Sequence, residues 1–183
     1  SAPYAETVLK LPKDELAFIL GGSGAVSGFL GVILGGRLSD WLRARNPSGR
    51  VLVIMFGIVA PVIPIWIGFT TENAALFYVM NFLAGLFAAT ALGAAAATTQ
   101  DLVLPRMRGT ATASFFLATT LVGLGLGPYM VGQISELTGS MRIGMLSLIG
   151  VAPISLVLLI YAYRTLPKAE ATIAERARAA AGE

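Results

Sequence analysis

Few side chains in this sequence could take part in catalysis. The 183 residues include no cysteine and no histidine, so the sequence lacks thiolate nucleophiles, imidazole bases and the commonest metal ligand. The carboxylates Asp40, Asp101 and Glu136 each lie at the end of an apolar run, and we expect them to be too far apart to form one site. The sequence therefore predicts a protein that is not an enzyme, with no catalytic residue, metal or cofactor.

Hydroxyl, amide and aromatic side chains inside the apolar runs are the remaining functional candidates. Together they suit a cavity that binds an amphipathic, largely apolar ligand. The alternative for each hydroxyl is a hydrogen bond back to the carbonyl four residues earlier in its own helix. Asn81 has four hydrogen-bonding positions and cannot satisfy them all within one helix. The candidate cavity residues are Ser23, Ser27, Tyr78, Asn81, Thr90, Phe116, Thr119 and Thr120.

The composition is that of an integral membrane protein. Hydrophobic residues make up 56% of the chain and charged residues 13%, about half the share that is usual in soluble domains. The net charge of +3 could indicate a nucleic-acid partner. However, the basic residues lie between apolar runs rather than on a face shared with aromatic residues. We therefore expect the lipid bilayer, and not nucleic acid, as the partner.

Five apolar runs are long enough to cross a bilayer as helices, which takes about 20 residues each. They are Leu16–Ser39, Val51–Phe69, Ala74–Thr98, Thr110–Gln133 and Ile143–Tyr163. The basic connection from Gly35 to Arg50 marks the cytoplasmic side, because Lys and Arg resist translocation. Alternation then places 10 of the 13 basic residues inside. This topology predicts an extracytoplasmic N-terminus and a cytoplasmic C-terminus in the cell inner membrane.

Polarity divides the five spans into two groups. The second and fifth spans are almost wholly apolar and are expected to face lipid over much of their surface. The first, third and fourth carry the polar residues and should face the interior of a bundle or a cavity. Small residues at steps of three and four also predict close helix packing in the first and third spans. These are Gly21, Gly24, Gly28, Gly31 and Gly35, and Ala84, Ala88, Ala91 and Ala95.

Prolines predict irregular points in three places. Pro61 and Pro64 should kink the second span. In the fourth span, Gly127 and Pro128 lie among further glycines, where a moving hinge and tight packing are both open interpretations. Pro167 can begin a new helix, so residues 166–183 are expected to form either a short amphipathic helix on the cytoplasmic surface or a solvated tail.

One motif resembles a known family. Gly36-Arg37-Leu38-Ser39-Asp40, followed by a basic loop ending at Arg50, is similar to the loop motif of the major facilitator superfamily. The loop is longer here, with NPSGR inserted. The stretches Gln100–Ala113 and Gly123–Glu136 further resemble the C-terminal half of bacterial spinster-like transporters. The motif residues carried over from the resemblance are Gly36, Arg37, Asp40, Arg45, Arg50 and Arg108.

The resemblance implies an all-α membrane protein, namely the C-terminal helical bundle of a major facilitator fold. Residues 1–14 would be the end of a seventh helix and an extracytoplasmic loop, and residues 15–165 would be helices eight to twelve. The bundle would be five full transmembrane helices plus the end of a sixth. The partner would be an N-terminal six-helix half of the same transporter. In that family, the third and sixth helices of each half sit outside the transport path.

The implied function is secondary active transport of an amphipathic lipid, such as a lysophospholipid or a sphingoid lipid, by alternating access. Proton coupling would reside in the N-terminal half. Asp40 could accept hydrogen bonds from the N-terminus of a partner-half helix, favoured by the helix dipole, or could simply pair with Arg43. A facilitator-type transporter of drugs or organic anions and a non-transporting membrane assembly subunit are the alternatives.

Overall fold

The computed structural model describes residues 13–181, and side chains within that range for residues 18–166, except residue 124, and for Thr172. Residues 1–12, which hold most of the expected seventh-helix end and loop, lie outside the described residues. All regular structure in the described part is helical. The domain division suggested by the sequence stays a prediction.

Five helical segments are long and apolar enough to span a membrane. The first is α2 (Lys13–Arg43), and the second is divided into α3 (Gly49–Val59) and α4 (Val62–Thr70). The third is α5 (Ala74–Asp101). The fourth comprises a 3-10 turn η1 (Pro105–Met107), α6 (Arg108–Thr120), a π-helical segment η2 (Leu121–Leu126) and α7 (Gly127–Thr138). The fifth comprises α8 (Met141–Leu146), a 3-10 turn η3 (Ser147–Gly150) and α9 (Val151–Ala181). The prediction of five spans is confirmed.

The helix breaks occur where the prolines and glycines predict them. In the second span, α3 ends at Val59 and α4 begins at Val62, directly after Pro61. In the fourth span, the π-helical segment ends where α7 begins at Gly127, with Pro128 in the first turn of α7. A π-helical segment inserts extra backbone into a helix, and such segments are frequent at functional sites. The irregular geometry is therefore confirmed, while movement at this point stays a prediction.

Two turns at the end of the bundle away from the basic loop have defined caps. The side chain of Asn73 accepts a hydrogen bond from the Leu76 N–H at 3.1 Å and begins α5. Gly139 follows α7 with a φ of 64°, the left-handed conformation in which glycine commonly ends a helix. Ser140 then caps α8. These caps fix the connections that join the second to the third span and the fourth to the fifth.

Close contact between α2 and α5 depends on two of the five glycines in the predicted seam. A Cβ atom on Gly35 would lie 2.5 Å from the Cα and carbonyl oxygen of Thr90, and one on Gly31 would lie 2.6 Å from the Ala89 Cβ. Gly57 of α3 approaches Ala91 of α5 in the same way. The remaining seam glycines, Gly21, Gly24 and Gly28, would meet nothing within 4 Å. The seam therefore packs only in its second half.

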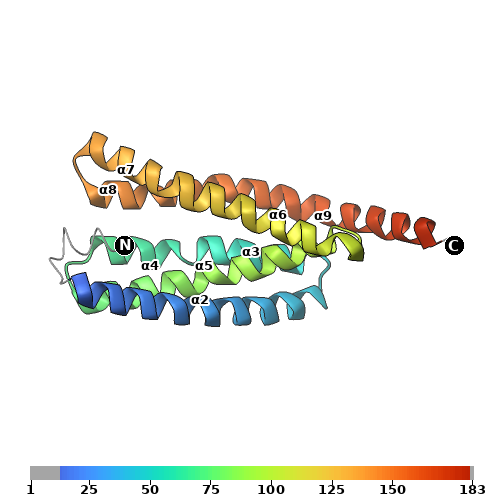
Figure 1. Ribbon diagram of the computed structural model, residues 1–183, viewed down its shortest axis with the longest axis horizontal. Helices are drawn as coiled ribbons and strands as arrows, with labels where there is room; N and C mark the ends of the chain where they lie inside the picture. Colours follow the sequence, from blue (N-terminus) through green and yellow to red (C-terminus); the bar gives the residue numbers. More distant parts are fainter. Residues whose placement is uncertain (1–12, 182–183) are drawn as a thin grey trace.

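The helices run side by side along the long axis in two groups, α2–α5 and α6–α9 (Figure 1). The groups meet where α9 packs on α3, α8 on α4 and α6 on α5. The sequence placed the second span at the periphery. Instead, α3 and α4 lie between α5 and the fifth span. In the most apolar stretch of this span 33% of the residues are buried, a larger share than in the other four spans. Only one face, with Phe56, Ile63 and Trp66, remains exposed.

The C-terminal segment differs from the predicted surface helix. α9 continues without a break from Val151 through Pro167 to Ala181 and extends beyond the ends of the other helices (Figure 1). Neither a separate helix at Pro167 nor an irregular tail is therefore correct for residues 166–181. The Ala, Glu and Arg residues after Pro167 have high helix propensity and continue the helix.

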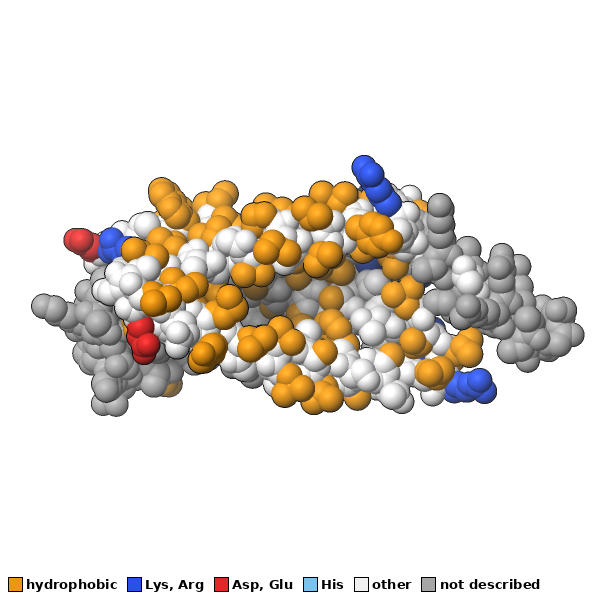
Figure 2. Space-filling view, turned by 90° about the horizontal axis from the view of Figure 1, so that it is seen from above, with side chains coloured by type: hydrophobic (Ala, Val, Ile, Leu, Met, Phe, Trp, Pro, Cys, Tyr) orange, Lys and Arg blue, Asp and Glu red, His pale blue; other side chains and the backbone are white. Residues whose placement is uncertain are grey.

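The charged side chains gather towards the two ends of the bundle, with a largely apolar band between them (Figure 2). Arg37, Arg43, Arg45 and Arg50 belong to the end that carries the α2–α3 loop, as do Asp40 and Asp101. Within the apolar band, large hydrophobic side chains such as Leu117 and Leu158 are more than half exposed. Exposed apolar surface of this extent is expected of a protein that has lipid as its solvent.

Candidate functional site

Four charged residues form one cluster at the end of the bundle that carries the α2–α3 loop. Arg50, in the first turn of α3, donates from Nη2 to Oδ1 of Asp40 at 3.1 Å. Its Nη1 donates to Oδ2 of Asp101, the last residue of α5. Arg43, the last residue of α2, donates to the same oxygen of Asp101. This charge cluster of Asp40, Arg43, Arg50 and Asp101 joins α2, α3 and α5.

The two carboxylates of the charge cluster differ in exposure. The side chains of Arg50 and Asp101 are 13% and 21% exposed, whereas that of Asp40 is 71% exposed. Loss of either partner of the part-buried Arg50–Asp101 pair would leave the other charge partly desolvated and uncompensated. Arg50 and Asp101 therefore depend on each other at this end of the bundle, and Asp40 presents an open carboxylate at its edge.

The cluster corrects the expectation that Asp40 and Asp101 lie too far apart to act together. They share one guanidinium, because the ends of α2 and α5 meet at the start of α3. Arg43, the alternative partner that the sequence offered for Asp40, donates to Asp101. Sequence analysis missed the pairing, although the predicted topology places both carboxylates on the same side of the membrane. Hydropathy and the distribution of Lys and Arg predict the membrane side of a residue but not the helix beside it.

The other residues carried over from the loop motif lie around the cluster without joining it. The guanidinium of Arg45 stacks on the Trp41 ring, 3.6 Å from the ring centroid. Arg37 and Arg108 are exposed. Gly36 is half-buried, with open space where a Cβ would be. Of the six motif residues, the structure thus brings only Asp40 and Arg50 into direct contact.

A cavity of about 390 Å³ lies between α2, α4, α5 and the α8–η3 segment. Ser27 of α2 and Asn81 of α5 are its polar side chains, and Phe69, Met145 and Leu148 form much of its apolar wall. Gly24 and Gly28, the seam glycines that pack against nothing, also line it. The volume lies within the range of about 300–1,000 Å³ that is typical of ligand pockets. The cavity carries no charge and suits an apolar molecule with one polar group.

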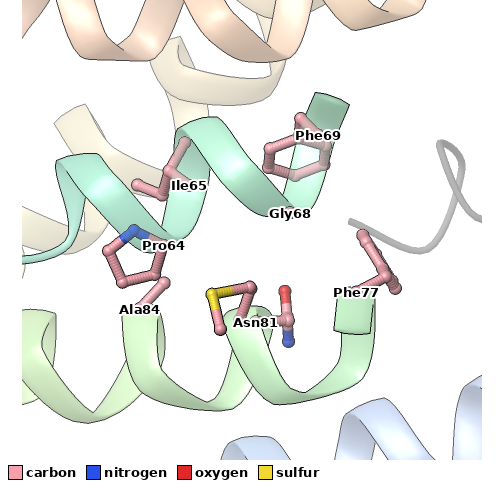
Figure 3. A pocket seen from close by; sticks show the side chains of 8 residues that line it. Pro64, Ile65, Gly68, Phe69, Phe77, Asn81 and Ala84 are labelled. Carbon is pink, nitrogen blue, oxygen red and sulfur yellow. The ribbon is translucent and has the colours of Figure 1, made fainter. Parts of the chain in front are cut away.

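Asn81 is the most distinctive group of the cavity. It is half-buried and also borders a smaller cavity of about 30 Å³ between α4 and α5, with Pro64, Gly68 and Phe77 (Figure 3). Figure 3 shows the Asn81 side chain in the space between these two helices. Among the described residues, its amide makes no hydrogen bond. An amide in apolar surroundings costs free energy unless it finds a hydrogen-bond partner, and Asn81 could therefore offer its amide to a polar group of a ligand.

Most of the predicted cavity hydroxyls bond back to their own helices. Ser23, Ser27, Thr90 and Thr119 each donate to a carbonyl three or four residues earlier, at 2.7–3.4 Å. Thr90 is also only 5% exposed and lies between Gly35 of α2 and Gly57 of α3. For Thr90 the cavity interpretation is therefore wrong, and the residue serves helix packing. Its register on α5 turns it towards two neighbouring helices at once.

The remaining candidate cavity residues lie in two separate places, one on α5 and the other on α6. Tyr78 is half-buried and packs beside Phe77, with 5.9 Å between ring centroids. Phe116, Thr119 and Thr120 lie on the exposed surface of α6. The most apolar stretch of the fourth span contains no buried residue. Within the described residues, no other helix therefore covers this polar surface of α6. These three residues are thus not joined to the Asn81 cavity, and their role stays a prediction.

A larger cavity of about 600 Å³ lies where the fourth and fifth spans are irregular. Its wall includes Gly123, Gly127 and Pro128 on one side, and Met141 and Met145 on the other. The predicted hinge residues therefore border an open apolar space, which sequence analysis did not predict. The glycines of this segment could have indicated the cavity, because a residue without a side chain leaves volume unfilled. Met145 and Leu148 line this cavity and the Asn81 cavity alike.

Comparisons with known proteins show similarity to membrane transporters. The chain is 31% identical over 139 residues to an MFS-type efflux pump of Mycolicibacterium smegmatis, covering 74% of the chain and 32% of the pump. It is 32% identical over 130 residues to Protein spinster of Drosophila melanogaster, covering 68% of the chain and 21% of that protein. It is 30% identical over 129 residues to the Sphingosine-1-phosphate transporter SPNS2 of Xenopus tropicalis, covering 68% of the chain and 24% of that transporter.

The matched segment thus spans less than a third of the length of these relatives. No solved structure matches the chain significantly. The family model described as Major Facilitator Superfamily matches residues 1–182. Together with five membrane-spanning helices and the Gly36–Asp40 motif at the start of the charge cluster, this match shows that the chain belongs to the Major Facilitator Superfamily.

Proposed function

We propose that this chain is the C-terminal half of a secondary active transporter that moves an amphipathic lipid, such as a lysophospholipid or a sphingoid lipid, by alternating access. The observation that carries the proposal is the Asn81 cavity, which combines one amide and one hydroxyl with an uncharged apolar wall. Such a lining suits an alkyl chain with a polar group near its end. The name of the sphingosine-1-phosphate transporter relative points to the same class of cargo.

The charge cluster supports the alternating-access part of the proposal. Its Arg50–Asp101 pair holds the ends of α3 and α5 together, and the exposed carboxylate of Asp40 remains free on one side to meet a second half of the transporter. A helix N-terminus in that half would attract the carboxylate through its dipole. The contact would hold the cytoplasmic end closed and would break when the halves rock apart.

Three further features belong to the same proposal. An N-terminal six-helix half would be the partner of this segment and would supply the proton-coupling residues. The protein would lie in the cell inner membrane, with the charge cluster on the cytoplasmic side. Of the arginines with described side chains, seven lie at the end with the charge cluster and one, Arg142, at the other, which is the distribution that the positive-inside rule predicts.

The second candidate function is efflux of drugs or organic anions. It is favoured by the similarity to an MFS-type efflux pump and by the apolar cavity of about 600 Å³ beside Gly127 and Pro128. A cationic or anionic drug would be expected to need an opposite charge in its site. The Asn81 cavity has none, so this function, like the binding of a charged lipid headgroup, would rely on charges supplied by the partner half.

Uptake by proteoliposomes that contain the full-length protein separates the two candidates. A fluorescent lysophospholipid and a fluorescent cationic drug are offered in parallel under a proton gradient. The lipid proposal predicts that the lysophospholipid accumulates above protein-free liposomes and that unlabelled sphingoid lipid competes with it. Transport of the drug alone would contradict the lipid proposal and would support efflux.

A further inference from the structure

Two hydrogen bonds link the α2–α3 loop to Tyr163 of α9 in the fifth span. Asn46 donates from Nδ2 to the Tyr163 hydroxyl at 3.1 Å. Ser48 donates from Oγ to the Tyr163 backbone carbonyl, also at 3.1 Å. Both donors belong to the inserted segment that makes this loop longer than the family motif. The insertion therefore has a defined contact, and that contact is with the last membrane span.

Pro167 explains why the Tyr163 carbonyl can accept this hydrogen bond. In an α-helix the N–H of residue 167 would donate to the carbonyl of residue 163. Proline has no N–H, yet α9 continues through Pro167. The Tyr163 carbonyl is thus left without its helical donor, and a backbone carbonyl that lacks both water and a donor is unfavourable. The hydroxyl of Ser48, a residue only 3% exposed, takes the place of the missing N–H.

The same loop determines the position of Arg50. The Asn46 side chain also accepts from the Ser48 N–H at 3.0 Å through Oδ1, and the Gly49 N–H donates to the Asn46 carbonyl at 2.8 Å. Gly49 packs so closely on α2 that a Cβ there would lie 2.5 Å from the Leu42 carbonyl oxygen. Arg50 follows directly and reaches Asp40 and Asp101. A continuous set of contacts therefore leads from Tyr163 to the charge cluster.

We propose that Tyr163 is a positioning residue for the charge cluster, so that α9 controls whether Arg50 can bridge Asp40 and Asp101. Movement of α9 relative to α3 would withdraw the loop and with it the guanidinium of Arg50. The proposal rests on the role in closure that the proposed function gives to the charge cluster, and it does not depend on which cargo is carried.

Thiol labelling of the full-length protein in proteoliposomes tests this role without any lipid cargo. This chain has no cysteine, and Thr98→Cys on the half-buried end of α5 beside Asp101 reports opening of this end. A membrane-impermeant thiol reagent is added on the side of the charge cluster. Tyr163→Phe removes one hydrogen bond and should raise the labelling rate about two- to tenfold. Tyr161→Phe on the exposed face of α9 is the matched control and should label at the wild-type rate.

Pro167→Ala separates positioning from a purely structural role. Alanine restores the N–H that competes with Ser48 for the Tyr163 carbonyl, and it also favours the helix. We expect a melting temperature at or above the wild-type value together with faster labelling. A purely structural contact would give higher stability and unchanged or slower labelling.

Arg50→Gln distinguishes the two ways in which the proposal could fail. Faster labelling with Arg50→Gln but wild-type rates with both Tyr163→Phe and Pro167→Ala would overturn the role of Tyr163 alone. A wild-type rate with Arg50→Gln would overturn this inference together with the role of the charge cluster in closure. The lipid cargo would remain to be judged by the uptake experiment.

Discussion

Gly35 and Gly28 lie seven residues apart on α2 but have opposite surroundings. A methyl group on Gly35 would overlap the backbone of Thr90, while one on Gly28 would meet nothing. Gly35→Ala should therefore push α2 from α5 and destabilise the protein by about 1–3 kcal/mol. Gly28→Ala should leave the stability unchanged or raise it slightly, since alanine favours a helix. Thermal unfolding of the two purified variants measures the difference, and equal melting temperatures would contradict the packing described here.

Asn81 is the residue through which the cavity is expected to hold the polar end of a lipid. Asn81→Ala removes that hydrogen bond and should lower lysophospholipid uptake about two- to tenfold. Thr98→Val on the same helix is the control, because the Thr98 hydroxyl already bonds back to the Ala94 carbonyl. Initial uptake rates in proteoliposomes provide the measurement. A loss of equal size in both variants would point to damage of α5 rather than to a role for Asn81.

At the level of single residues, the sequence is most informative where the chemistry of the side chain is decisive. Asn81 was singled out because an amide cannot satisfy itself within its own helix, and the structure places it at two cavities. Thr90 was assigned to the cavity by its polarity, yet it packs between α2 and α3. The rotational register of α5 decides that outcome, and a hydroxyl is compatible with either surrounding.

The fourth span is the element whose irregularity bears most on transport. A π-helical segment precedes Gly127, and Pro128 lies in the first turn of α7 beside the larger cavity. Pro128→Ala restores a backbone N–H and should stiffen this point. We expect uptake to slow several-fold without a change in the substrate concentration that gives half the maximal rate.

The control for this element is Pro153→Ala, which changes a proline in the first turns of α9 that has only one glycine close to it in sequence. Its uptake rate should match that of the wild type. Faster or unchanged uptake by Pro128→Ala would contradict the hinge and would leave tight packing as the role of these glycines.

Some helices could be predicted from the sequence and others could not. The five spans, the break at Pro61 and the irregular point before Gly127 follow from hydropathy and from the backbone limits of proline and glycine. The packing of α3 and α4 between α5 and the fifth span does not follow, because an apolar helix can contact lipid or other apolar helices equally well. The continuous α9 was also missed, since a proline that begins a helix and one that a helix tolerates look alike in sequence.

At the scale of the whole molecule, Asp40 is the group expected to connect this half with its partner. Asp40→Asn removes the charge that a partner helix dipole would attract, an interaction worth about 0.3–1 kcal/mol at an exposed site. The protein should shift roughly two- to fivefold towards the inward-open form. Labelling of cysteines placed on either side of the membrane measures the shift, and wild-type accessibility on both sides would count against the contact.

Transport through this half requires a water-filled path beside its polar helices, and the polarity of the spans predicts that the α6 surface with Thr119 borders this path while α9 faces lipid. Thr119→Cys and Leu158→Cys test it directly in the full-length protein, because a charged thiol reagent needs both water and a thiolate. Both positions are exposed at a similar depth of their spans. The account predicts that Thr119→Cys is labelled far faster than Leu158→Cys and that lysophospholipid slows its labelling. Equally slow labelling of both, unaffected by lipid, would contradict it.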